Sequence, residues 1–113
     1  MPRTEILVVT SNHSGQQLSP SLVSDPVNMN KMLNDGRTIL VLSNRFGVTP
    51  VVFTIYTVVL IDGDLTVQHR AGTIAPGQVM AFGSFPMAIY NDPDGYVEFD
   101  TDTAIPVIAV SIG

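Results

Sequence analysis

The sequence contains no cysteine and no tryptophan, and few of its residues are charged. Without cysteine the chain has no disulfide scaffold, no thiolate nucleophile and no zinc site with cysteine ligands. Charged residues make up 13% of the chain, about half the usual share in a globular domain. Much of the surface must therefore be uncharged, which favours contact with other protein.

Positive charge is especially scarce. The chain has five Lys and Arg against ten Asp and Glu, for a net charge of -5. The cations stand singly along the sequence and form no basic stripe, so nucleic acid is not an expected partner. No stretch reaches the ~18 consecutive apolar residues of a membrane span, and no apolar segment of signal-peptide length precedes Ser11. We expect no membrane contact, and synthesis in a cytoplasm.

The 113 residues suffice for one domain, and their pattern favours β-structure. Turn signals recur about every 8 to 12 residues, which is typical of a sandwich or barrel, and no amphipathic helix longer than one turn is expected after residue 36. Strands are expected at residues 5–10, 37–43, 51–61, 65–69, 78–82, 96–100 and 105–112, with a hairpin joining 51–61 to 65–69. The expected core residues are Leu40, Leu42, Phe53, Ile55, Val97, Phe99, Ile108 and Val110.

These patterns predict an all-β fold: an antiparallel β-sandwich, jelly-roll or immunoglobulin-like, over residues 37–113, with an N-terminal strand and long extended arm over residues 1–36. The arm is polar and contains proline, and long loops of this kind are usually functional or disordered. Asp25 before Pro26 could start one helical turn over residues 27–33. Apolar residues in the arm have no sustained period, so we expect them to contact a neighbouring protein: Leu18, Leu22, Val23, Val27, Met29, Met32 and Leu33.

The histidines and acidic turns form no recognisable catalytic or metal-binding pattern. His13 and His69 are the only histidines, and no nucleophile-elbow sequence accompanies them. Asp92 and Asp94 share a turn whose oxygens could hold a cation, but the spacing of a twelve-residue calcium loop is not met. We expect a solvated turn there, and whether it binds a cation stays open.

Glu98 and Asp100 are two residues apart on a predicted strand, so their carboxylates would share a face, as a glycosidase pair does. Nothing in the sequence predicts a cleft around them, and an exposed acidic face explains them as well. We expect no enzymatic activity, no bound metal and no cofactor.

The order of turns is the most specific signal in the chain. It runs through Asn34-Asp35-Gly36-Arg37-Thr38, Ala75-Pro76-Gly77, Gly83-Ser84-Phe85-Pro86, Tyr90-Asn91-Asp92 and Asp94-Gly95. From about Asn34 to Ser111 the sequence resembles small virion proteins of tailed bacteriophages, in particular capsid decoration (cement) proteins. The chain departs from that group at two places. The turn before the Gly-x-Phe-Pro bend is often Pro-Ala-Gly in the group but is Ala75-Pro76-Gly77 in this sequence, and the segment before Asn34 is more apolar in this sequence.

The resemblance implies a β-sandwich on the outside of an icosahedral phage head, with the major capsid protein as partner and the virion exterior as location. Such proteins commonly bind as homotrimers at local symmetry axes. Self-association also follows from the 45% hydrophobic content, because so small a monomer could not hide all of its apolar surface.

Other functions stay open from the sequence. Another phage structural role, in head completion, a connector or a tail, fits the same features. A carbohydrate-binding β-sandwich would need exposed aromatic residues on one face. Tryptophan is absent and the only tyrosines are Tyr56, Tyr90 and Tyr96, so the sequence offers few residues for such a site. An enzyme would need a titratable cleft around His69.

Overall fold

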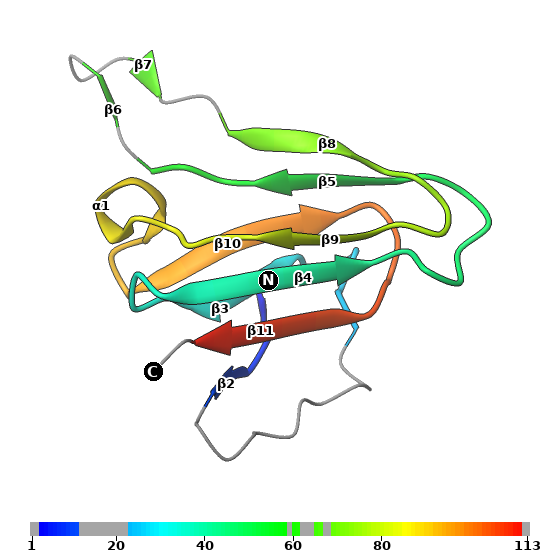
Figure 1. Cartoon of the computed structure of the whole chain (residues 1–113). Coiled ribbons are helices and arrows are strands. Elements are labelled where there is room, and N and C mark those ends of the chain that lie inside the picture. The colour runs from blue at the N-terminus through cyan, green and yellow to red at the C-terminus, as the bar shows by residue number, and fades with distance from the viewer. Residues whose placement is uncertain (1–2, 12–22, 59, 62–64, 67–68, 112–113) are drawn as a thin grey trace.

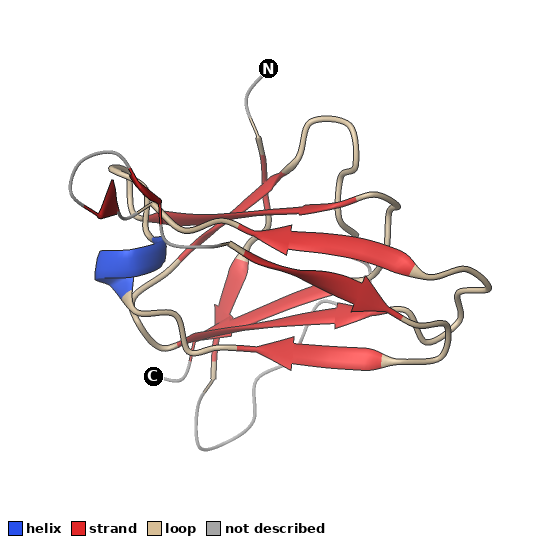
Figure 2. Cartoon of the chain, turned by 90° about the horizontal axis from the view of Figure 1, so that it is seen from above, coloured by secondary structure: helices blue, strands red, loops and turns tan. Residues whose placement is uncertain are grey.

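The computed structural model describes residues 3–11, 23–58, 60–61, 65–66 and 69–111. Two mixed sheets pack face to face, an arrangement compatible with the predicted β-sandwich (Figure 1, Figure 2). Sheet A has the order β1 (Thr4–Glu5), β3 (Asn30–Leu33), β10 (Tyr96–Thr101), β5 (Val51–Ile55) and β8 (Arg70–Ile74). Sheet B has the order β2 (Val8–Thr10), β11 (Val107–Ser111), β4 (Thr38–Ser43) and β9 (Val79–Phe82).

Strand directions after residue 37 follow the prediction. Every pairing among these strands is antiparallel, as expected. For the N-terminal strands no direction was predicted: β1 runs parallel to β3 and β2 runs parallel to β11, which makes both sheets mixed. The two parallel strands each add to one edge of a sheet whose other pairs are antiparallel.

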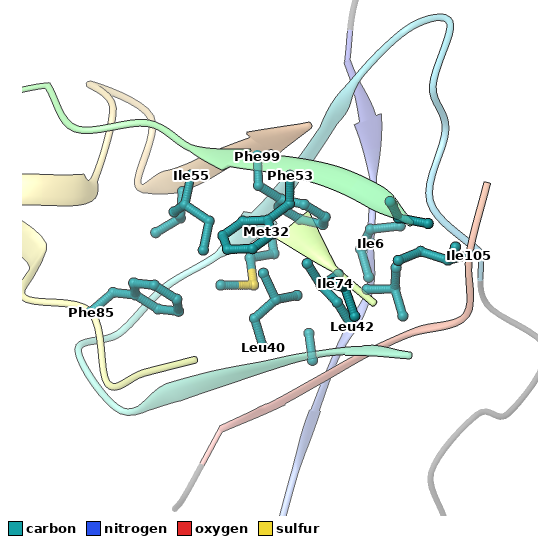
Figure 3. Packing of buried hydrophobic residues seen from close by; sticks show 14 residues of the cluster. Ile6, Met32, Leu40, Leu42, Phe53, Ile55, Ile74, Phe85, Phe99 and Ile105 are labelled. Atoms are coloured by element: carbon teal, nitrogen blue, oxygen red, sulfur yellow. The ribbon is translucent and has the colours of Figure 1, made fainter. Parts of the chain in front are cut away.

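The core lies between the sheets and follows the alternation of the strands (Figure 3). In β4, residues 38, 40 and 42 are buried and those between them are half-buried. Six of the eight predicted core residues are buried: Leu40, Leu42, Phe53, Ile55, Val97 and Phe99.

The prediction for the last strand was wrong by one residue. Ile108 and Val110 are half-buried on the outer face of sheet B, whereas Val107 and Ala109 are buried. All four positions are apolar, so alternation along this strand carries no information about which face points inward. Pairing decides it, because Val107 and Ala109 lie opposite core residues of β4.

The segment predicted as one strand over residues 5–10 is two strands in different sheets. The chain leaves sheet A after Glu5 and joins sheet B at Val8. Between them Ile6 points into the core with 2% of its surface exposed, and its backbone N–H donates to the carbonyl of Lys31 at 2.8 Å. This crossing closes one lateral side of the molecule.

The helical turn predicted over residues 27–33 is also wrong. Residues 26–28 form a turn, Met29 has a φ of 67°, and β3 follows at once. Asn30–Leu33 pairs with both β1 and β10, and its alternate residues are buried. Residues 30–33 of the predicted arm are thus a strand of sheet A, and Val23 forms an isolated bridge with Pro106, so a long extended arm is not supported. Within the segment 1–36, residues 1–2 and 12–22 lie outside the described residues.

The long strand predicted over residues 51–61 is interrupted. β5 ends at Ile55, and the expected hairpin with the next segment is made by β6 (Leu60–Ile61) and β7 (Leu65–Thr66). The turn predicted at residues 62–64 lies outside the described residues. The strand Arg70–Ile74 was not predicted, since its sequence has small and polar residues at its centre. The one described helix, α1 (Met87–Tyr90), is a single turn.

Candidate functional site

The residues predicted to contact a neighbour do not all lie on the surface. Leu18 and Leu22 fall outside the described residues. Met32 is completely buried in the core, which corrects its assignment as a contact residue, because it packs between the chain's own sheets. The remaining four are exposed: Val23 by 52%, Val27 by 72%, Met29 by 37% and Leu33 by 49%.

Asp25 organises the turn that carries the exposed Val27. Its Oδ1 accepts from the backbone N–H groups of Val27 at 2.9 Å and Asn28 at 3.0 Å. Its Oδ2 accepts from the Thr4 hydroxyl at 2.6 Å, which ties this turn to β1. The predicted capping role of Asp25 thus exists, but it serves a turn instead of a helix. These bonds, led by the one from Thr4, lower the pKa of Asp25 from 3.8 to about 2.

We expect this carboxylate to make the fold acid-sensitive. Because the folded-state pKa is depressed, the stabilisation is fully present above pH 3.8 and is lost as the pH falls toward 2. The Asp25→Asn variant should therefore lose less thermal stability between pH 4 and pH 2 than the wild type, measured by unfolding midpoints at several pH values. Asp94→Asn, at an exposed turn position, serves as the control and should behave like the wild type. Parallel curves for wild type and Asp25→Asn would contradict the assignment.

Glu98 and Asp100 share the outer face of sheet A, as expected, and both form ion pairs with one arginine. Arg3 Nε lies 3.3 Å from Glu98 Oε2, and its Nη1 donates to Asp100 Oδ1. The other Asp100 oxygen accepts from the Tyr56 hydroxyl, and that bond raises the pKa of Tyr56. The two carboxylates, the Tyr56 hydroxyl and Arg3 therefore form one hydrogen-bonded cluster. The cluster links β10 to β5 and to residue 3.

The remaining titratable candidates serve turns and loops. Asp92 Oδ1 accepts from the backbone N–H groups of Asp94 at 2.9 Å and Tyr96 at 3.0 Å, which closes the predicted turn. His69 Nδ1 accepts from the N–H of Thr57 at 2.9 Å. Among the described residues, no three His, Asp or Glu side chains gather in a way that could hold a metal ion, and His13 lies outside them.

The most exposed large apolar side chains lie on the loop between β4 and β5, residues 44–50, at the right-hand end of Figure 1. Phe46 is 86% exposed and Val48 is 91% exposed. Arg45 covers one side of the Phe46 ring, with its guanidinium carbon 5.1 Å from the ring centroid. A hollow of about 370 Å³ lies beside this loop and extends to Ile105 and Pro106. We call Phe46, Val48 and this hollow the apolar end.

A buried asparagine holds this loop in shape. The Asn44 side chain donates to the carbonyls of Thr49 and Ile74, both at 2.9 Å, and only 3% of the residue is exposed. The backbone of Asn44 also bonds to the loop between β8 and β9. Its N–H donates to the carbonyl of Gln78 and its carbonyl accepts from the N–H of Gly77, both at 2.8 Å. The exposed apolar side chains are therefore presented on a braced loop.

Sequence reasoning missed the apolar end. The signal was available in the run Asn44-Arg45-Phe46-Gly47-Val48, where two large apolar residues sit among turn-forming residues that cannot bury them. Single exposed apolar residues are ordinary on protein surfaces, but a phenylalanine and a valine this exposed on one short loop suggest a contact surface.

Comparison with known proteins returned nothing for this chain: no family model, no curated protein and no solved structure matches it. Among the described residues no helix is long and apolar enough to cross a membrane.

Proposed function

We propose that this chain is a bacteriophage capsid decoration protein that binds the outer surface of the icosahedral head and stabilises it as a homotrimer. The observation that carries the proposal is the apolar end, with Phe46 and Val48 exposed on a loop that Asn44 braces. A shell-binding protein works by burying area against a larger surface, and exposed aromatic residues on a rigid support are common anchors of such interfaces.

The carboxylates support the same reading. The two that could have formed a hydrolytic pair both contact Arg3, which favours a structural role in tying residue 3 to sheet A. With the sequence resemblance from residue 34 onward, an assembly role is favoured over an enzyme or a carbohydrate-binding module. Head completion, connector and tail roles share these features, and the number of copies per virion separates them from decoration.

The finer fold that we propose is a jelly roll, which has eight strands in two sheets. Leaving out β1 and the β6–β7 hairpin, the strands in chain order are β2, β3, β4, β5, β8, β9, β10 and β11. A jelly roll places strands one, eight, three and six in one sheet and strands two, seven, four and five in the other. Sheet B has the first order, β2-β11-β4-β9, and sheet A has the second from β3 onward, β3-β10-β5-β8. In an immunoglobulin sandwich the last strand would lie beside β10, whereas β11 pairs with β4. The parallel pairing of β2 with β11 is the one departure from the antiparallel jelly roll among these eight strands.

If the apolar end provides the adhesion, Phe46→Ser combined with Val48→Ser should weaken binding to mature empty shells by about 100-fold or more, since each buried anchor contributes about 1 to 3 kcal/mol. Folding should be unaffected, because both side chains are exposed. The measurement is a pelleting assay of purified protein with expanded shells. Binding should persist at high salt, because an apolar contact is not screened.

Met87→Ser is the matched control, since Met87 is 51% exposed and lies on α1 at the opposite end of the molecule (Figure 1). The rival adhesion surface is the predicted arm. Deleting residues 11–33 would remove β3 and the buried Met32, so the arm is tested by replacing residues 12–22 with a Gly-Ser linker of equal length. Unchanged binding by the Phe46 and Val48 variant, with loss in the linker variant, would place adhesion on the arm.

A further inference from the structure

The two lateral sides of the molecule are built differently. On one side the crossing from β1 to β2 closes the gap between the sheets, with Ile6 filling it. On the other side the outermost strands are β8 in sheet A and β9 in sheet B, and neither has a second partner strand among the described residues. Unpaired strand edges readily accept further protein.

A groove runs along this open side. Its apolar part is a cavity of about 390 Å³ lined by Phe53, Ile55, Phe82 and Phe85, which come from both sheets and the loop after β9. The Phe53 and Phe82 rings meet across the sheets with centroids 4.8 Å apart. Gly72 places no side chain beside the Phe53 ring, where a Cβ would lie 3.1 Å from it. Phe53 is 6% exposed and Phe82 is half-buried, so Phe82 offers more of the apolar surface.

The groove continues into a second cavity of about 570 Å³, which shares Arg70, Ala71, Ser84 and Tyr90 with the first and extends to His69. The described residues lining both cavities include no Asp or Glu. Each of the polar side chains that line the groove can donate a hydrogen bond, and the hydroxyls of Ser84 and Tyr90 can also accept one. Arg70 is exposed and makes no ion pair with any described residue.

His69 adds another donor. Its Nδ1 accepts a hydrogen bond from the backbone N–H of Thr57, so the proton of the neutral ring lies on Nε2. A groove with an aromatic floor and a donor-rich rim suits an extended segment that carries an apolar side chain next to a carboxylate.

The closed side of the molecule presents such a segment. Leu7 is 64% exposed, and Glu5, two residues earlier, is exposed and makes no ion pair with any described residue. From the described residues the Glu5 carboxylate accepts one long hydrogen bond, of 3.4 Å, from the Tyr96 hydroxyl. Since Ile6 points into the core, Glu5 and Leu7 point away from it, about 6.6 Å apart along an extended chain.

We propose that the β1–β2 side of one copy docks into the β8–β9 groove of a second copy, with Leu7 against Phe53 and Phe82 and with Glu5 paired to Arg70. The inference rests on the proposed self-association and names its two surfaces. Because the surfaces differ, the contact is heterologous, and a suitable rotation between copies closes it into a ring such as a trimer.

The test is a charge exchange followed by sedimentation of the free protein. Glu5→Arg and Arg70→Glu should each weaken self-association by about 10-fold or more, because each places like charges together, and Leu7→Ser should do the same by removing the apolar contact. The double variant Glu5→Arg with Arg70→Glu should recover association to within about 3-fold of wild type, since the pair is restored with its signs reversed. Arg37→Glu, an equal charge change at an exposed turn position, is the control and should associate normally.

Because the chain has no native cysteine, pairs of introduced cysteines can test the contact by disulfide cross-linking. Leu7→Cys with Ala71→Cys should form disulfide-linked oligomers on oxidation, whereas Leu7→Cys with Ala104→Cys, an exposed loop position outside the groove, should not.

Three results would overturn the inference: a monomeric wild type, no effect of Arg70→Glu, or no recovery in the double variant. An unaffected Arg70→Glu protein would mean that this arginine only guards an unpaired edge against aggregation. Shell pelleting of the same variants tests the proposed function separately. A wild type that stays monomeric yet binds shells would reject this interface and leave decoration standing, and loss of shell binding in Arg70→Glu would then assign the groove to the shell protein.

Discussion

Replacing Asn44 with alanine is expected to lower the free energy of unfolding by about 3 kcal/mol. The side chain is buried, and its amide satisfies the carbonyls of Thr49 and Ile74. Alanine would leave both carbonyls without this donor in a site that excludes most water. The measurement is urea unfolding at neutral pH, and a loss below about 1 kcal/mol would show that water replaces the amide at little cost.

A variant at Gly47 tests the same hydrogen bonds in a second way. A Cβ at this position would lie 1.8 Å from Asn44 Oδ1, so Gly47→Ala must displace the buried amide. We therefore expect Gly47→Ala to destabilise the wild type but to add little in the Asn44→Ala background, where the amide is already absent. Additive effects would show that the glycine acts through its backbone alone.

A comparable effect is expected from Val107→Asp, because this side chain is completely buried opposite Leu42. An unpaired carboxylate there should cost about 4 kcal/mol or more, enough to unfold many small domains. The neighbouring Ile108→Asp should cost less than about 1.5 kcal/mol, since Ile108 is half-buried on the outer face. Circular dichroism and urea unfolding of the two variants side by side measure the difference. Equal losses would mean that the inward face of β11 is wrongly assigned.

Val107 and Ile108 also show which feature of a strand the sequence could not predict, namely the face that points into the core. β4, β9, β10 and β11 were each predicted within two residues of their bounds, because glycine, proline and aspartate mark the turns around them. The face of β11 could not be predicted, since Val107-Ile108-Ala109-Val110 is apolar throughout. In β4, by contrast, the inward residues Leu40 and Leu42 were identified correctly.

The N-terminal third was the least predictable part of the fold. Its strands are short, and each is stabilised by partners far away in the sequence, as when β1 and β10 flank β3. The Asp25 turn and the hydrogen bond from Thr4 form only once those partners meet. Local propensity therefore favoured a helical turn where tertiary pairing makes a strand.

The candidate surfaces were predicted less well than the strands. Four of the seven predicted contact residues are exposed, but the apolar end and the lateral groove were not foreseen. Phe46 lies in a loop with no periodic pattern to mark it. The groove is assembled from Phe53, Phe82 and Arg70, whose proximity depends on the packing of two sheets.

The position of β11 has a consequence for how the protein is made. This strand lies between β2 and β4, so that Ala109 is paired with Val8 on one side and with Leu40 on the other. A ribosome delivers β11 after every other described strand, so until then β2 has no partner in sheet B and β4 is paired on one side at most. Nascent chains must therefore carry uncovered core residues until synthesis is nearly complete, and folding that depends on such distant pairs is slow. Chaperones that shield exposed apolar segments should associate with this chain until its last strand is released.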